Sequence, residues 1–434
     1  MATDPQFAAA YAFVGRVYSD IGEAGLSVEN TRKAWQLRNR ASDQEKFFID
    51  FSYYRIVMGN LEKAGQTCEM WSRTYPRDAF PHTFLGASTS VALGKFEKAA
   101  AEEKKAIELN PDHPFAYFNL ASSYLLRGRL AEALITIKQA ADRKLEIPEF
   151  LALRYQIAFL KDDQEEMERL AALAQEKFGA ADWIQDWICD HESYALAYSG
   201  HLQKARIKSR RAVDLARQRG HRENAAQHEA GAAVGEILFG NVSEARRSAI
   251  STLDLSKDRD AEYGAALALA LSRDSSRSQV LADDLNKRFP EDTLVVFSYL
   301  PALRAVLALN RGKPSTAIEL LQVAAPYELG CQGSGTVGFA GSLYPIYVRG
   351  EAYLAAHQGS EAAAEFQKIL DHRGIVVSNP IGALAHLQIG RAYALSGDKA
   401  KSKSAYQDFL TLWKDADPDI PIFKEAKAEY EKLK

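Results

Sequence analysis

The pattern of apolar and polar positions is clearest between Pro114 and Pro148, where it predicts two amphipathic helices joined by a short turn. In the first helix, apolar and small residues recur at steps of three and four, which places them on one helical face: Tyr117, Leu120, Ala121 and Tyr124. Gly128 follows and suits a helix end that needs a left-handed backbone. A second face of this kind comprises Leu130, Ala133, Leu134, Ile137 and Ala140. The stretch therefore predicts a helical hairpin with almost no loop.

The hairpin recurs along nearly the whole chain and is marked by two small residues twelve positions apart. The pairs are Gly15/Ser27, Ser52/Ala64, Ala87/Ala99, Ala121/Ala133, Ser193/Ala205, Ala233/Ala245, Ala305/Ala317, Gly350/Ala362 and Gly390/Ser402. Tyr155/Met167 has the same register with large residues, and a unit near Leu267 carries no pair. Small residues let two helices cross closely, so we expect each pair at the contact point of its hairpin. A repeat of this length predicts a solenoid of stacked units.

The unit resembles the tetratricopeptide repeat. Residues 116–124 carry the first half of its signature, and Phe96 to Ala99, with Ala106, Leu109 and Pro111, carry the second half. The resemblance implies an all-α fold, a right-handed superhelical solenoid of about eleven helix–turn–helix units over about residues 8–416. We expect residues 1–434 to form one solenoid domain, with a Gly-rich insertion at 330–342 and a capping helix at 419–434.

Several segments also resemble the C-terminal region of bacterial transmembrane serine/threonine protein kinases and related multidomain sensors. These segments are residues 4–12, 289–294, 325–330, 366–374 and 406–421. In that family the repeats follow a kinase or other effector module and a membrane helix. The resemblance implies that the chain is a segment of a larger signalling protein and that it lies outside the cytoplasm. Asp4-Pro5 at the start of the sequence has the form of a junction between repeats, which agrees with a longer protein.

Composition narrows the classes of function. A net charge of −3 argues against a nucleic-acid-binding protein, which usually has a strong basic excess. The three cysteines (Cys68, Cys189, Cys331) are too far apart to indicate a disulfide framework or a zinc ribbon. No apolar run approaches the roughly 18 residues of a membrane span. Protein or extended peptide is therefore the expected partner, and self-association is a second one.

No motif predicts catalysis, so we expect no catalytic residue, no cofactor and no metal ligand in this chain. Residues 333–338 match the phosphate-binding pattern G-x-G-x-x-G, but no strand signal precedes them, which favours a flexible loop. The residues Cys189 to Glu192 form the densest ligand-like cluster. Neighbouring helix residues point in different directions, which argues against a metal site there. The chain is therefore interpreted as a non-enzyme.

Two other features leave alternatives open. Eight basic residues between Lys204 and Arg222 would suit an acidic partner or an anionic lipid, or would form a solvated outer face. Trp183 and Trp187, four residues apart, would form an aromatic platform for a ligand or part of the core.

The repeat register predicts which residues face the inner groove. In tetratricopeptide arrays the first helices line the concave face, and the residue after each small position, or one turn before it, points inward. The candidate groove residues are Arg16, Tyr53, Phe84, Phe118, Ser122, Gln156, Tyr194, Glu351 and Arg391. Aromatic and arginine side chains are common anchors in protein interfaces. We therefore expect a scaffold or sensory module that binds a protein or peptide; the alternative is a self-association scaffold that brings attached effector domains together.

Overall fold

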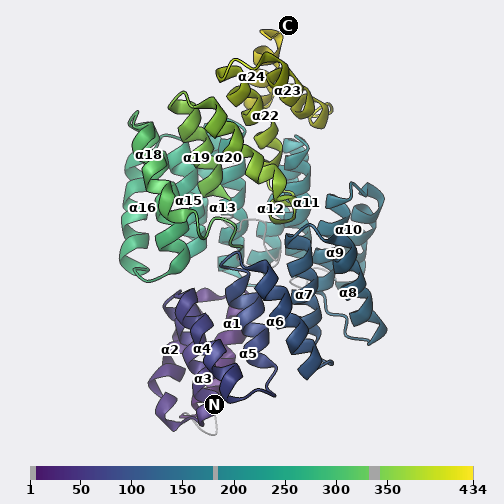
Figure 1. Cartoon of the computed structure of the whole chain (residues 1–434), viewed down its shortest axis with the longest axis vertical. Coiled ribbons are helices and arrows are strands. Elements are labelled where there is room, and N and C mark those ends of the chain that lie inside the picture. Colours follow the sequence, from purple (N-terminus) through teal and green to yellow (C-terminus); the bar gives the residue numbers. More distant parts are fainter. Residues whose placement is uncertain (1–5, 179–183, 332–342, 434) are drawn as a thin grey trace.

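The computed structural model describes residues 6–178, 184–331 and 343–433. Across these residues all regular secondary structure is helical, and the helices follow one another as hairpins. The N- and C-terminal hairpins lie at opposite ends of the long axis (Figure 1). The described chain confirms the predicted all-α solenoid of about eleven units with a C-terminal capping helix.

The hairpins have the following bounds within the described residues. The first six are α1 (Ala8–Asp20) with α2 (Ala24–Gln36), α3 (Asp43–Ser52) and η2 (Tyr53–Val57) with α4 (Leu61–Thr74), α5 (Phe80–Thr83) and η3 (Phe84–Ser90) with α6 (Phe96–Leu109), α7 (Pro114–Leu126) with α8 (Leu130–Asp142), α9 (Glu149–Leu160) with α10 (Gln164–Phe178), and α11 (Ile184–Tyr198) with α12 (Leu202–Gln218). The next five are α13 (Arg222–Leu238) with α14 (Val242–Leu255), α15 (Arg259–Leu271) with α16 (Ser275–Arg288), η4 (Val295–Tyr299) and α17 (Leu300–Asn310) with α18 (Pro314–Leu321), α19 (Tyr344–Ala355) with α20 (Gly359–Asp371), and α22 (Pro380–Leu395) with α23 (Lys399–Leu412). Short helices η1 (Arg38–Arg40), η5 (Gln322–Ala324) and α21 (Arg373–Val376) lie between hairpins, and α24 (Pro421–Glu431) follows the last one.

The small pairs lie where the two helices of a hairpin touch. The Ser27 hydroxyl on α2 donates a hydrogen bond to the Gly15 carbonyl on α1 at 2.7 Å. Gly350 on α19 is covered by the Phe366 ring of α20, and a methyl group added at Gly350 would lie 2.6 Å from a ring carbon. Side chains larger than alanine would separate these helices. Two further pairs repeat the serine bond, Ser193–Ala205 and Ser402–Gly390.

Three first helices contain a π-helical turn, in which an amide bonds to the carbonyl five residues earlier. In η2 the amide of Met58 donates to the carbonyl of Tyr53 at 3.0 Å, and in η3 the amide of Val91 donates to Gly86 at 3.2 Å. The turn η4 closes in the same way on Val295. A π turn inserts one residue into a helix, and such turns are frequent at functional sites.

Hairpin turns of the early units touch the loops before much later units, so successive turns of the superhelix are in contact. The amide of Thr293 donates to the Gly59 carbonyl at 3.0 Å, and the amide of Leu61 donates to the Thr293 hydroxyl at 3.1 Å. We call this set of contacts the inter-turn seam. Its pairs are Ile21 with Asn224, Gly59 with Thr293, Val91 with Cys331, Leu125 with Gly374, and Gly200 with Asp417.

The C-terminal hairpin and α24 extend the same seam. Trp413 is fully buried, and its indole N–H donates to the Tyr198 carbonyl on α11 at 2.9 Å. The amide of Ile422 donates to the carbonyl of Phe239, which ends α13. On α24, Phe423 and Ala426 are buried, while Lys424, Lys427 and Glu431 are exposed, as a solenoid cap requires. No helix among the described residues combines the length and the apolar character needed to cross a membrane.

Candidate functional site

The site begins with a cavity of about 760 Å³ between the first three units and the seventh to ninth units. We call it the inter-turn pocket, because its walls come from two successive turns of the superhelix. One wall is formed by the end of α1, the start of α2 and the π turns η2 and η3. The opposite wall is formed by the start of α13, the loop before α15 and the segment that leads into η4. A volume of this size is typical of small-molecule and cofactor sites.

All three π turns of the described chain contribute to this pocket. Arg55 comes from η2, Ser88 from η3 and Tyr299 from η4. The three turns are far apart in the sequence, so local sequence alone does not account for their meeting. The inter-turn pocket is therefore the candidate functional site.

An ion-pair network holds one wall of the pocket in place. Arg259 pairs with Asp292 at 2.7 Å and with Asp260 at 2.9 Å. The Tyr299 hydroxyl donates to Asp260 at 2.8 Å. Because each Arg259 contact is charge-assisted and partly shielded from solvent, the network fixes the geometry of this wall.

Carboxylates occupy the two helix N-termini at the pocket. Asp258 caps α15 by accepting hydrogen bonds from the amides of Asp260 and Ala261, and burial, together with the charge of Asp260, raises its pKa to about 7. Glu223 from α13 accepts hydrogen bonds from the amides of Ala24 and Gly25 at the start of α2. Burial raises the pKa of Glu223 above its usual value.

Arg55, in η2, is a basic side chain on the wall formed by the first three units. Its Nε donates to the Ser88 carbonyl at 3.4 Å, and neighbouring Arg16 donates to the Ser88 hydroxyl at 3.3 Å. Burial, with repulsion from Arg16 and Arg259, lowers the pKa of Arg55 to about 10. The guanidinium therefore keeps its positive charge at neutral pH.

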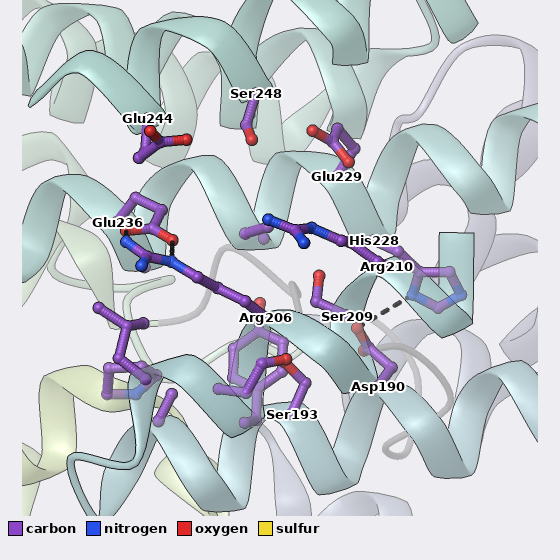
Figure 2. A pocket seen from close by; sticks show the side chains of 18 of the residues that line it. Asp190, Ser193, Arg206, Ser209, Arg210, His228, Glu229, Glu236, Glu244 and Ser248 are labelled. Atoms are coloured by element: carbon purple, nitrogen blue, oxygen red, sulfur yellow. Dashed lines mark hydrogen bonds and ion pairs between the residues drawn. The ribbon is translucent and has the colours of Figure 1, made fainter. Parts of the chain in front are cut away.

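A second, smaller cavity of about 100 Å³ lies between α11, α12, α13 and α14 (Figure 2). Figure 2 shows Arg206 and Glu236 facing each other at one end of this cavity, where they form two hydrogen bonds of 2.6 and 2.7 Å. At the other end, His228 pairs with Asp190 at 3.1 Å. This cavity has room for only a few water molecules, so it is a poor candidate for a ligand.

The helix that carries the Cys189 to Glu192 cluster holds a buried charge network. His228 lies between Asp190 and Asp186, and Asp186 also pairs with Arg219 at 2.6 Å. Burial disfavours a charged His228, but the two aspartates outweigh burial and raise its pKa to about 10. Asp190 and His191 thus have roles in packing, and the described chain contains no group of three His, Cys, Asp or Glu side chains arranged to hold a metal ion.

Three of the predicted groove residues belong to the first three units; none of them lines the inter-turn pocket, although Arg16 contacts Ser88, which does. Arg16 is half-exposed and pairs with Asp20 at 2.9 Å. Tyr53 is half-buried and stacks on Trp35, with ring centroids 4.1 Å apart. Phe84 lies beneath the Arg16 guanidinium, which is 5.4 Å from the centre of its ring.

Four predicted groove residues are buried in the middle of the solenoid. Phe118 meets Phe150 edge to face, and the Ser122 hydroxyl donates to the Phe118 carbonyl one turn earlier. Gln156 contacts the His191 ring at 3.4 Å, and Tyr194 lines the small cavity of Figure 2. First helices in this region are buried on nearly all sides; in α15 every residue from Ala261 to Ala270 is buried. The inner surface is therefore packed here instead of forming an open groove.

The last two predicted groove residues, Glu351 and Arg391, lie near the C-terminal end. Arg391 on α22 forms two hydrogen bonds of 2.9 Å with Glu429 on the capping helix. Burial raises the pKa of Glu351 to about 7, although the charge of Arg391 opposes that change. These two residues are remote from Arg16 and Tyr53 along the solenoid.

The sequence did not point to Arg55, Arg259, Asp292 or Tyr299. Arg55 is only two residues from the predicted Tyr53, but the π turn changes the helical register between them. The other three belong to the opposite wall, which reaches the pocket only through the contact of superhelical turns. The glycines at the hairpin turns lie at that contact. The sequence alone did not reveal the contact, because a glycine at such a position is also explained by the end of a helix.

The other sequence features have the following positions. Within the basic run, Arg206, Lys208 and Arg219 pair with acidic side chains of the same chain, while Lys204, Arg210, Arg211 and Arg217 are exposed. Trp187 is buried on α11. Trp183, the glycines of residues 333–338 and most of the predicted 330–342 insertion lie outside the described residues.

Comparison with known proteins supports the repeat assignment for one unit. The model of the tetratricopeptide repeat family matches residues 104–135, which run from α6 into α8. Superkiller protein 3 of Schizosaccharomyces pombe is 25% identical over 169 residues. That match covers 38% of this chain and only 12% of the length of the relative.

Two solved structures are similar to this chain at low sequence identity. Yeast Tom70 is 12% identical, with 98% of this chain and 95% of that chain covered and a TM-score of 0.38. The Cut9 and Hcn1 hetero-tetramer of the APC/C gives 11% identity, coverage of 96% and 74%, and a TM-score of 0.46. The assignment of a tetratricopeptide-type solenoid therefore rests on the helices of this chain and on the matched unit.

Proposed function

We propose that the solenoid is a non-catalytic scaffold that binds a segment of a partner protein at the inner face of its first three units. The observation that carries the proposal is the contrast between these units and the centre. Arg16, Tyr53 and Phe84 remain partly exposed in the units that form one wall of the 760 Å³ inter-turn pocket, whereas the corresponding residues of the central units are buried.

Such a surface suits recognition of an extended segment. The helices are held by core packing before a partner arrives, so the scaffold loses little conformational freedom on binding. The aromatic ring of Tyr53 and the guanidinium of Arg16 are side chains of the kind that dominate interface energetics. The pocket beside them would accept a larger side chain of the partner.

A displayed peptide library tests this proposal. Peptides selected on the wild-type protein would be measured against Tyr53→Ala, for which we expect at least about a tenfold loss of affinity. Ile207→Ala is the matched control, because Ile207 is 65% exposed on the second helix α12. If Tyr53→Ala leaves the affinities unchanged, or if both variants weaken them equally, the inner face is not the binding surface.

Self-association remains a second candidate function, and one observation favours it. Phe13 and Val17 lie one turn apart on α1 and are 56% and 57% exposed, although the outer face of a terminal repeat is normally polar. A second copy could cover this apolar face. Light scattering of the wild type and of Phe13→Ser tests this function. A monomeric mass at every concentration would rule it out.

A role in signalling is the most specific part of the proposal. It rests on the resemblance of five short segments to bacterial transmembrane kinases, and that resemblance would also place this chain outside the cytoplasm. Reporter fusions to the gene that encodes this chain would test the location. A gene that encodes no effector module would contradict the signalling role but not the scaffold role.

A further inference from the structure

Arg55 is a partly buried cation for which no ion pair is recorded within the described residues. Its recorded hydrogen bond goes to the neutral Ser88 carbonyl at 3.4 Å. A buried charge is costly unless a partner of opposite charge compensates it.

Each acidic side chain that lines the pocket already has a partner. Asp20 pairs with Arg16, and Asp260 and Asp292 pair with Arg259. Glu223 accepts hydrogen bonds from amides at the start of α2, and Asp258 caps α15. In the described chain, none of these five carboxylates forms a recorded ion pair with Arg55.

The basic side chains of the pocket are not balanced in the same way. Arg259 pairs with aspartates, and Arg288 pairs with Glu262 at 2.7 Å. For Arg32 and Lys257, as for Arg55, no ion pair is recorded within the described residues, and both are exposed at the pocket.

Five of the lining residues are acidic and five are basic. Glu223 and Asp258 also lack a recorded ion pair, but burial raises the pKa of both carboxyl groups, which favours their neutral forms. With these two carboxyl groups neutral, the charges left without a recorded ion pair are those of Arg32, Arg55 and Lys257.

We propose that the inter-turn pocket binds an oxyanion, a phosphate or carboxylate group, with the Arg55 guanidinium as its main contact. Arginine presents several N–H donors in a plane and binds such groups through two parallel hydrogen bonds. Arg32 and Lys257 add favourable charge at the rim. The oxyanion belongs either to a small molecule or to an acidic or phosphorylated side chain of a partner. This inference goes beyond the scaffold function, because a small molecule would bind without any partner.

A bound oxyanion would also connect two turns of the superhelix. Arg55 belongs to the second unit, whereas Lys257 precedes the eighth unit. A ligand that contacts both walls binds the native state and not the unfolded chain, so it stabilises the fold by an amount that rises with the logarithm of its concentration above Kd.

The experiment measures thermal unfolding and binding heat with three probes: inorganic phosphate, citrate, and a phosphoserine peptide with both termini blocked. Sodium chloride at equal ionic strength is the reference, because it screens charges without occupying the site. We expect at least one probe to raise the unfolding temperature of the wild type above that reference. In Arg55→Gln its affinity should fall by about tenfold or more.

Two further variants make the test specific. Arg55→Lys keeps the charge and should retain part of the affinity, and Arg32→Gln at the exposed rim should weaken binding by a few-fold. Arg211→Gln is the control, since Arg211 is an exposed arginine of α12 that does not line the pocket. Arg32→Gln serves as the test variant if Arg55→Gln does not fold.

The three probes distinguish the two possible sources of the oxyanion, a small molecule and a side chain of a partner protein. Binding of phosphate or citrate alone identifies a small molecule as the natural ligand class, and binding of the peptide alone identifies a partner side chain. The proposal is overturned if no probe stabilises the wild type beyond sodium chloride, or if the Arg55 and Arg32 variants bind as the wild type does. The Tyr53→Ala result is independent of these outcomes, so the scaffold function can fail while the oxyanion site stands.

Discussion

At the residue scale, the small positions of the repeat are contact points whose neighbours leave no spare room. Gly350 lies against the Phe366 ring, and Gly390 lies against the Tyr406 ring, where an added methyl group would come within 2.8 Å of a ring carbon. The Ser27 hydroxyl shows a second use of a small residue, because it bonds to the carbonyl of the facing helix. Close helix packing and hydrogen bonding are thus combined at one repeat position.

Gly350→Ala should destabilise the protein by about 1–3 kcal/mol, because the methyl group overpacks the contact with Phe366. Gly235→Ala is the matched control. Gly235 lies inside α13 with no atom within 4 Å of the added methyl group, so alanine should stabilise that helix by about 0.5–1 kcal/mol. Urea unfolding measures both changes. Equal effects would show that the small positions are not constrained by packing.

Glu103 makes the stability depend on pH. Burial raises the pKa of its carboxyl group well above the ordinary value of 4.5. The folded state therefore binds more protons than the unfolded state in the window above that value. Stability should fall by about 1.4 kcal/mol for each pH unit as pH rises through this window.

Glu103→Gln should remove this part of the pH dependence and make the protein more stable at about pH 8 relative to wild type. The measurement is the free energy of unfolding of both proteins between about pH 5 and about pH 8. Glu361→Gln, on the exposed face of α20, should leave the slope as in the wild type. An unchanged slope in Glu103→Gln would contradict a protonated Glu103 in the folded state.

At the scale of elements, the hairpin was predictable and its irregularities were not. The spacing of apolar residues predicted helices whose ends lie close to those observed in α7 and α8. The glycines predicted at the turns have a left-handed backbone, for example Gly312 with φ of 70°. The π turns were not predictable, because their extra residue is stabilised by packing against other units and not by a local sequence signal.

Hairpin turns that lack glycine test whether the left-handed backbone at these turns favours glycine. Arg273 ends α15 with φ of 61°, a conformation that costs a side-chain-bearing residue about 1–2 kcal/mol. Arg273→Gly should therefore stabilise the protein by up to about 1 kcal/mol, after the entropy loss of glycine is subtracted. Gly312→Ala, at an equivalent turn with free space around it, should destabilise by about 1 kcal/mol. Denaturant midpoints that move in the same direction would contradict this account.

At the scale of the whole molecule, the inter-turn seam decides where a ligand can bind. The seam brings α2 against α13 and the turn after η2 against the segment before η4, and the inter-turn pocket lies between them. The repeat register correctly predicted a solenoid. It assigned Arg16 and Tyr53 to an inner groove, and that assignment stays a prediction. The opposite wall depends on the pitch of the superhelix, which sums small rotations over many units and cannot be obtained from one unit.

Gly59→Ala should disturb the seam in addition to the local turn. An added methyl group at Gly59 would collide with the Asp292 side chain, whereas at Gly312 it would meet open space. Both positions have a left-handed backbone, so the strain of the turn is the same in both variants. We expect Gly59→Ala to cost about 1–3 kcal/mol more than Gly312→Ala.

Hydrogen exchange shows which part of the protein Gly59→Ala destabilises. In Gly59→Ala the amides of Leu61 and Thr293 should lose protection, because their bonds cross the seam. In Gly312→Ala the same two amides should keep their protection. A loss of protection at the two amides in both variants would indicate general destabilisation instead of an opened seam.

The seam also has a consequence for how the chain folds. A linear array in which each unit touches only its neighbours can nucleate anywhere and fray from its ends. Here the side chain of Asn224 bonds to the carbonyl of Ile21, 203 residues earlier in the chain. Contacts between residues so distant in sequence close large loops, which slows folding and couples distant units to one another. This solenoid should therefore unfold as one cooperative body, and its first units should acquire their full stability only after the seventh to ninth units have folded.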